Sequence, residues 1–173
     1  VVRLSPLDFP SGRDVLSKKW PDADSKQVDL LAQLCAGAPG RAISLAESGT
    51  ADCYQVACSL LAESKPSVNA MAALTGKWGR GAGAGRTIRE GAVFCLDRLL
   101  RLAALSASGR NEFVPCDFEV PAIRVLCDRH SSGRLAVFHR ELLRESATAE
   151  GLYMDFSQFL LRQMIKFSEK TLL

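Results

Sequence analysis

One stretch of the chain is rich enough in glycine to suggest a phosphate-binding loop. Residues 76–85 read Gly-Lys-Trp-Gly-Arg-Gly-Ala-Gly-Ala-Gly. A P-loop needs Gly-x4-Gly-Lys-Ser/Thr, because its backbone amides cradle phosphates and its hydroxyl holds magnesium. Here Met71 takes the place of the first glycine, and Trp78 follows Lys77 where the hydroxyl is needed. A dinucleotide-binding Gly-x-Gly-x-x-Gly also fails, because Arg86 stands at its third glycine and no strand pattern precedes it. The stretch is therefore predicted to be a loop between helices.

Cysteine, histidine and glutamate supply the residue types of a metal or catalytic site without the required spacing. Cys127 and His130 stand three residues apart, whereas a structural zinc site needs four ligands. A Cys–His nucleophile also needs an orienting group and an oxyanion hole, and the sequence indicates neither. Glu141 and Glu145 lie one helical turn apart beside arginines, which is typical of surface ion pairs. We predict no catalytic residue, no metal site and no cofactor.

Arg41 is the residue best placed to contact an anion. It follows Pro39-Gly40 in the first turn of a helix predicted over residues 39–49. A guanidinium there can make bidentate contacts with a phosphate held by a neighbouring domain. A surface arginine beside an N-terminal turn fits the same pattern, so both interpretations stay open.

Basic residues are concentrated in one central stretch. Six basic residues against two acidic ones leave a surplus of +4 over residues 76–101, although the whole chain carries only +3. Such a surplus could meet an acidic partner or a nucleic-acid backbone. We favour a solvated helix face, because no interleaved aromatic residues are available to stack on bases. The basic residues are Lys77, Arg80, Arg86, Arg89, Arg98 and Arg101.

The composition is that of a globular protein. Of the 173 residues, 47% are hydrophobic and 24% are charged, which excludes a disordered or fibrous chain. There is no run of about 18 uncharged apolar residues, so no transmembrane helix is predicted. The six cysteines include no Cys-x-x-Cys pair and fall mostly at apolar positions. They are predicted to be buried free thiols in a reducing, cytoplasmic compartment.

The elements that position these residues are predicted to be helices throughout. Apolar residues recur at helical spacing, and no alternating strand pattern is found. We expect an all-α chain of six to eight helices with a division near residues 48–52, where Gly49 ends a three-helix unit. The first helices are expected at 14–20, 24–35 and 39–49, and Asp24 with Gln27 three residues later resembles a capping box at the start of the second. The others follow at 50–65, 67–74 and 87–105, from residue 122 onward and from residue 156 onward.

The last helix carries a broad apolar stripe. Its residues are spaced i, i+3, i+4, i+8 and i+11, as one face of a helix requires. Part of this face is expected to close the core and part to contact other subunits. The residues are Phe156, Phe159, Leu160, Met164 and Phe167.

Three segments resemble one family. Residues 34–47, Leu-Cys-Ala-Gly-Ala-Pro-Gly-Arg-Ala-Ile-Ser-Leu-Ala-Glu, are similar to the Gly-Ser-Pro-Gly-Arg-Ala-Leu segment of delta-prime subunits of the bacterial DNA polymerase III clamp loader. Residues 2–7 resemble the family's entry to its lid domain, and residues 150–158 resemble its C-terminal ending. The chain departs from the family at Cys35, Ala38 and residues 153–156.

The resemblance implies an AAA+ clamp-loader fragment that follows a nucleotide-binding module. Residues 1–50 would be a lid remnant and residues 51–173 a helical collar, through which loader subunits form a ring. Partners would be the tau/gamma and delta subunits, and the sliding clamp and primed DNA would be reached through the full complex. Arg41 would occupy a sensor-2-like position in a subunit that does not hydrolyse ATP. The alternatives are a tau/gamma subunit fragment and an unrelated helical adaptor, with a thiol enzyme ranked last.

Overall fold

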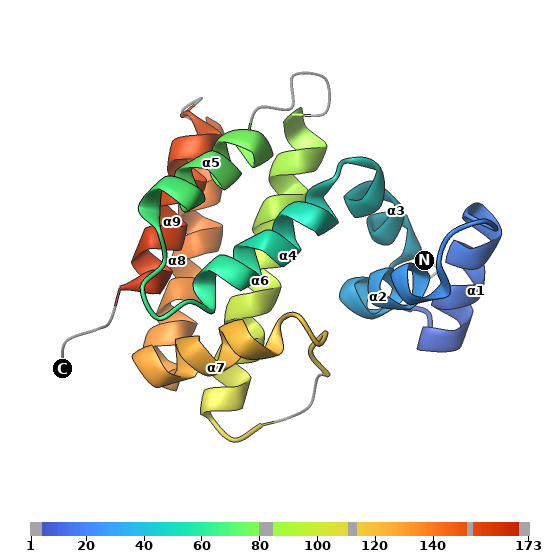
Figure 1. Ribbon diagram of the computed structural model, residues 1–173, viewed down its shortest axis with the longest axis horizontal. Coiled ribbons are helices and arrows are strands. Elements are labelled where there is room, and N and C mark those ends of the chain that lie inside the picture. Colours follow the sequence, from blue (N-terminus) through green and yellow to red (C-terminus); the bar gives the residue numbers. More distant parts are fainter. Residues whose placement is uncertain (1–4, 80–84, 111–113, 152–153, 170–173) are drawn as a thin grey trace.

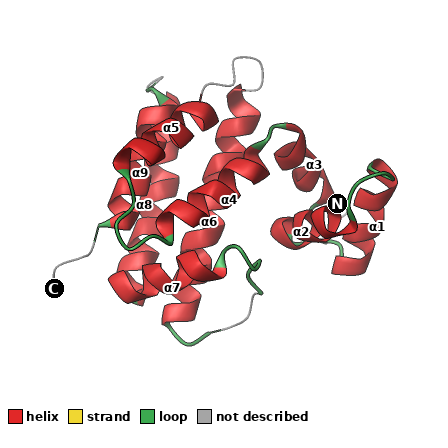
Figure 2. Cartoon of the chain, in the orientation of Figure 1, coloured by secondary structure: helices red, strands yellow, loops and turns green. Residues whose placement is uncertain are grey.

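The computed structural model describes residues 5–79, 85–110, 114–151 and 154–169. Within these ranges the chain forms nine helices and no strand, which confirms the all-α prediction (Figure 2). The predicted number of six to eight was too low. The chain adopts an extended conformation at His130, and this divides the helical segment predicted from residue 122 onward into two helices.

Three short helices form a group at one end of the molecule (Figure 1). They are α1 (Phe9–Lys19), α2 (Ser25–Cys35) and α3 (Pro39–Glu47), and they pack against one another. Helix α1 begins five residues earlier than predicted. The Asp8 side chain accepts a hydrogen bond from the Ser11 amide at 2.9 Å, and a proline lies in the first turn, where its missing amide proton costs nothing. Helix α2 begins, as predicted, after Asp24, which caps it.

The turn between α2 and α3 depends on glycine. Ala36 and Gly37 both have positive φ, 45° and 84°, which ends α2 in a left-handed turn. The Leu7 amide donates a 2.9 Å hydrogen bond to the Gly37 carbonyl. A Cβ atom at Gly37 would lie 2.2 Å from the Leu7 carbonyl oxygen, so no larger residue fits without moving the backbone.

The remaining six helices form a bundle. The long helix α6 (Gly85–Ala107) packs along α8 (Ser132–Gly151), and α5 (Val68–Gly79) packs along α9 (Phe156–Ser168) (Figure 1). Helix α4 (Thr50–Leu61) contacts α5, α6 and α7 (Val120–Arg129). No helix in the described ranges is long and apolar enough to cross a membrane.

Part of the glycine-rich stretch is helical, contrary to the prediction of a loop. Helix α5 continues through Gly76 to Gly79, while residues 80–84 lie outside the described residues. Trp78, in this last turn, is only 2% exposed. Burying its large ring outweighs the cost of glycine in a helix, about 1 kcal/mol per residue.

Helix α3 joins the three-helix group to the bundle. It ends at Glu47, and Gly49 (φ 68°) leads into α4 at Thr50, so a helix boundary lies where the sequence predicted a division. Helix α3 also packs on α6, where a Cβ atom at Gly91 would lie 2.8 Å from a methyl of Leu45. The buried apolar residues form one continuous core from α1 to α9. The assignment of residues 1–50 and 51–173 to separate domains stays a prediction.

Candidate functional site

Arg41 lies at the junction between the three-helix group and the bundle. Its side chain is exposed, and its guanidinium carbon lies 4.4 Å from the centre of the Phe94 ring on α6. This is the geometry of a cation–π contact. The first turn of α3 therefore directs Arg41 toward the bundle, where the sequence left open whether it had any contact.

Arg41 lines a cleft of about 530 Å³, which we call the Arg41 cleft. One wall is the turn at residues 36–38 together with Arg41. The other wall is a face of α6 that carries Phe94, Asp97, Arg98 and Arg101. Three arginines and one aspartate thus contribute atoms to the lining of the cleft. The sequence singled out Arg41 alone and did not indicate that arginines from two distant segments share a cleft.

The charge of Arg98 is neutralised inside the bundle by Glu119, which precedes α7. Arg98 donates from Nε to Glu119 Oε1 at 2.8 Å and from Nη2 to Oε2 at 3.1 Å. The Tyr54 hydroxyl donates to Oε1 at 2.6 Å, and the Cys116 amide donates to Oε2 at 2.7 Å. The two charged side chains are almost fully buried, and four hydrogen bonds reach the carboxylate. These hydrogen bonds compensate the two buried charges for the loss of water. The Arg98–Glu119 pair therefore has a structural role.

The loop before α7 also contacts the three-helix group. Gln33 on α2 donates from Nε2 to the Pro115 carbonyl at 3.0 Å. Because Cys116 and Glu119 fix the same loop from the bundle side, this hydrogen bond connects α2 to the Arg98–Glu119 pair. Sequence reasoning missed this network. Its members come from four segments up to 86 positions apart, from Gln33 to Glu119, and no local spacing reveals them.

The basic surplus predicted for residues 76–101 is largely dispersed by pairing. Arg86 pairs with Glu90 at 2.7 Å, and Arg98 is buried against Glu119. Arg89 lies over the Phe156 ring, 5.5 Å from its centre. Lys77 is exposed near the end of α5, and Arg80 lies outside the described residues. Lys77, Arg86 and Arg101 are exposed, whereas Arg89 is half-buried and Arg98 is buried, so the predicted solvated face holds for only part of the stretch.

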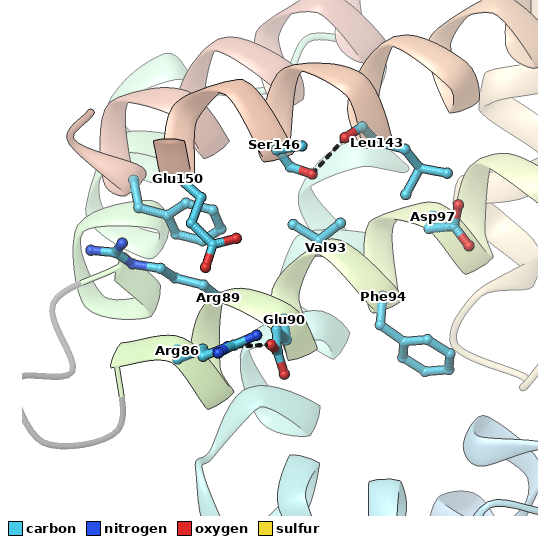
Figure 3. Close-up of a pocket in the computed structure, with 11 residues that line it drawn as sticks. Arg86, Arg89, Glu90, Val93, Phe94, Asp97, Leu143, Ser146 and Glu150 are labelled. Atoms are coloured by element: carbon cyan, nitrogen blue, oxygen red, sulfur yellow. Dashed lines mark hydrogen bonds and ion pairs between the residues drawn. The ribbon is translucent and has the colours of Figure 1, made fainter. Parts of the chain in front are cut away.

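A second cavity lies between α6 and α8 (Figure 3). This groove has a volume of about 340 Å³ and is lined mainly by apolar atoms. Val93 points between the two helices, and Leu143, 44% exposed, lies across from it. The Arg86–Glu90 pair forms one end of the groove (Figure 3).

The five apolar residues predicted on the last helix face inward. Phe156 and Phe159 are 6% exposed, and the other three are fully buried. Phe167 packs against Phe138 of α8 with ring centres 5.6 Å apart, and its carbonyl lies 2.9 Å from His130 Nε2. The apolar area expected to stay free for a partner is therefore absent from these five side chains. Their role in subunit contacts stays a prediction. The exposed side chains of α9 are polar ones such as Gln158 and Arg162.

Glu141 and Glu145 of α8 pair with α9, and the sequence did not indicate this pairing. Lys166 of α9 forms ion pairs with Glu141 and, at 3.7 Å, with Glu145. Gln163 also donates to Glu145 Oε2 at 2.7 Å. The carboxylates therefore join α8 to α9, whereas the sequence predicted ordinary surface pairs with the neighbouring arginines.

The cysteines and histidines occupy structural positions. All six cysteines are free, and five are buried, which confirms the prediction of buried thiols. Burial raises the pKa of Cys35 and of Cys116 to about 12, so these thiols are protonated at neutral pH and unreactive. The Cys127 sulfur lies 3.4 Å from the Ala103 carbonyl, away from any metal-like arrangement with His130. Among the described residues, no three His, Cys, Asp or Glu side chains gather as metal ligands would.

Comparison of the chain with models of known protein families, with curated proteins and with solved structures finds no match.

Proposed function

We propose that this chain is an assembly segment of a bacterial DNA polymerase III clamp loader, from its delta-prime subunit. One observation carries the proposal. The segment that resembles the family's lid motif forms the left-handed turn between α2 and α3, followed by a bundle of six helices. Gly37 is required there by its φ of 84° and by the contact with Leu7, so the motif corresponds to a specific local structure.

In this proposal the three-helix group is the remainder of a lid and the bundle is a collar. Both would hold the subunit in a cytoplasmic ring with the tau/gamma and delta subunits, and the sliding clamp and primed DNA would be contacted by the whole complex. The sequence Pro39-Gly40-Arg41-Ala42 favours delta-prime over tau/gamma. The segment itself carries out no reaction. The thiol enzyme is disfavoured by the burial that raises the pKa of Cys35 and Cys116.

Arg41 would keep the sensor-2-like place that the resemblance implies. Its stack on Phe94 covers one face of the guanidinium and leaves the N–H groups at its edge. A nucleotide contact made through that edge is compatible with the stack.

Binding to purified loader subunits tests this proposal. The tagged chain is immobilised and mixed with tau/gamma and delta subunits from the same source, with sliding clamp alone and primed DNA alone as separate samples. We expect retention of tau/gamma together with delta, and no retention of the clamp in their absence. If the loader subunits pass through unretained, the assembly proposal is wrong.

A further inference from the structure

We propose that two copies of this chain associate through the groove between α6 and α8, as a two-fold symmetric dimer centred on Val93. The inference goes beyond the proposed assembly function and does not depend on it, because it rests only on residues that line this groove. Such a dimer requires a surface that is complementary to itself, so that each contact occurs twice. The charged and apolar residues along α6 meet this requirement.

One side of α6 carries a positive, an apolar and a negative residue at equal spacing. Arg89, Val93 and Asp97 follow one another at intervals of four, which places them along one side of the helix, and all three line the groove. Figure 3 shows Arg89 and Asp97 on opposite sides of Val93. Because a helix rises about 1.5 Å per residue, the two charged residues are separated by about 12 Å along its axis.

This pattern is complementary to its own reverse. When a second α6 lies antiparallel over the first, with the two Val93 residues opposite each other, Arg89 of each copy comes level with Asp97 of the other. Two ion pairs then flank one apolar contact. A parallel arrangement would place like charges together, which is unfavourable at an interface. The charges therefore select the antiparallel pairing of two copies.

Arg89 has no ion-pair partner in the part of the chain that the structure describes. Its Nε atom is shielded from solvent and lacks a hydrogen-bond partner, and its guanidinium carbon lies 5.5 Å from the centre of the Phe156 ring. Both carboxylates at this end of the groove act on Arg86. The hydrogen bond with Glu90 and, after it, the charge of Glu150 raise the pKa of Arg86. A carboxylate from a second copy would therefore meet a guanidinium that is still unpaired.

Asp97 also lacks a complete set of contacts. Its Oδ1 atom lies 2.7 Å from His139 Nε2 of α8, but the two groups do not align as a hydrogen bond. Its side chain is 20% exposed, so a donor from another molecule can reach the carboxylate. Four buried side-chain atoms among the described residues lack a hydrogen-bond partner, and two of them belong to Arg89 and Asp97. The groove thus holds unsatisfied groups of opposite sign at its two ends.

The space between these charged ends is apolar. Leu143 of α8 lies across from Val93 and is 44% exposed, and Ala147, one turn further along α8, is exposed as well. Removing these side chains from water favours association. The strip spans only about three turns of α6, which is short for an obligate dimer. We therefore expect a reversible dimer that forms in the micromolar range.

Sedimentation equilibrium of the chain alone, from low to high micromolar concentration, tests the proposal. The parent chain is compared with Arg89→Glu, with Asp97→Lys and with the variant that carries both substitutions. Each single substitution places like charges together twice in the dimer, so it should weaken association by about tenfold or more. The double variant restores both ion pairs with their signs exchanged and should recover most of that loss. Circular dichroism of each variant verifies that it is folded.

Mixing the two single variants gives a second, independent measurement. In a mixed dimer the introduced Glu of one chain faces the introduced Lys of the other, and the native Asp97 and Arg89 face each other at the second site. The mixture should therefore form dimers under conditions where neither variant associates with itself. Loss of folding in either variant cannot produce this result.

Leu143→Glu should also weaken the dimer, because it places a charge in the apolar part of the groove. Val56→Glu on α4 is the matched control, since Val56 is 49% exposed and does not line the groove. The proposal is overturned if the parent chain stays monomeric over the whole range, which would leave the groove to a different protein, or if the double variant associates no better than the single ones. No other protein is present, so the outcome is independent of whether loader subunits bind.

Discussion

The Tyr54 hydroxyl donates a 2.6 Å hydrogen bond to the carboxylate of Glu119, which lies 65 residues later in the chain. The same carboxylate receives the Arg98 guanidinium and the Cys116 amide. Helices α4 and α6 and the loop before α7 are thus joined at one buried group. Because Gln33 of α2 reaches the same loop, the three-helix group is also tied to this point.

Replacing Glu119 with glutamine should destabilise the chain strongly. The substitution leaves the Arg98 charge buried without its counter-ion, which costs about 3–5 kcal/mol. Urea denaturation followed by circular dichroism measures the change in the free energy of unfolding. Glu90→Gln is the matched control, because Glu90 pairs with Arg86 at an exposed site and its loss should cost about 0.5 kcal/mol or less. Equal losses in the two variants would contradict the role assigned to Glu119.

Gly37 and Gly12 should respond in opposite directions to alanine. At Gly37 the positive φ and the Leu7 backbone leave no room for a methyl group, and a cost of about 2 kcal/mol or more is expected. Gly12 is helical, and a Cβ atom added there would meet nothing within 4 Å, so alanine should stabilise α1 by up to about 1 kcal/mol. Thermal unfolding of the two variants compares them directly. A stable Gly37→Ala variant would show that the turn tolerates a side chain.

The stack of Arg41 on Phe94 should appear as a coupling energy. A double-mutant cycle with Arg41→Ala and Phe94→Leu is expected to give about 0.5–1 kcal/mol, the range of an exposed cation–π contact. Nothing in the spacing of the sequence indicates Phe94 as a partner of Arg41. Additive effects of the two substitutions would show that the contact contributes nothing to stability.

Stability should fall as the pH drops through the titration of His130. Burial lowers the pKa of this histidine below its ordinary value of 6.5, although its contact with the Phe167 carbonyl acts the other way. The unfolded chain therefore binds the proton more tightly than the folded chain. Stability is complete above the unfolded pKa and is lost as the pH falls below it. Urea denaturation of the parent chain and of His130→Asn at several pH values from neutral to mildly acidic should show a smaller decline in the variant, and parallel declines would refute the assignment.

Removing residues 150–173 should abolish cooperative unfolding. The deletion takes away Leu160 and Met164, which are fully buried, and each large apolar side chain lost from a core costs about 2–5 kcal/mol. Calorimetry of the truncated chain should show no sharp transition. A sharp transition would mean that α9 is dispensable for the core. Tests of assembly therefore need substitutions on the exposed face of α9.

Local patterns explain what the sequence predicted well. The Asp24 cap, the helical spacing in α6 and the stop at Gly49 depend on neighbours within a few residues, and they correctly placed most helices. The glycine-rich segment around Trp78 was wrongly predicted to be a loop. It stays helical in part because distant helices bury Trp78, and the local sequence does not show this burial. The stripe on α9 was identified as one face, but its complete burial depends on how α4, α5 and α8 surround it. The Arg98–Glu119 pair and the Arg41 cleft join distant segments, and no spacing within the chain encodes them.

Analytical ultracentrifugation of the chain with tau/gamma and delta subunits tests the assembly proposal most directly. The parent chain should sediment in one complex with both subunits. Arg162→Glu, which reverses a charge on the exposed face of α9, should weaken that complex, and Arg124→Glu on α7 should serve as the comparison. We expect a complex with all three components and a larger loss of that complex for Arg162→Glu than for Arg124→Glu. Sedimentation of the chain as a separate species, under conditions where tau/gamma and delta associate, would contradict it.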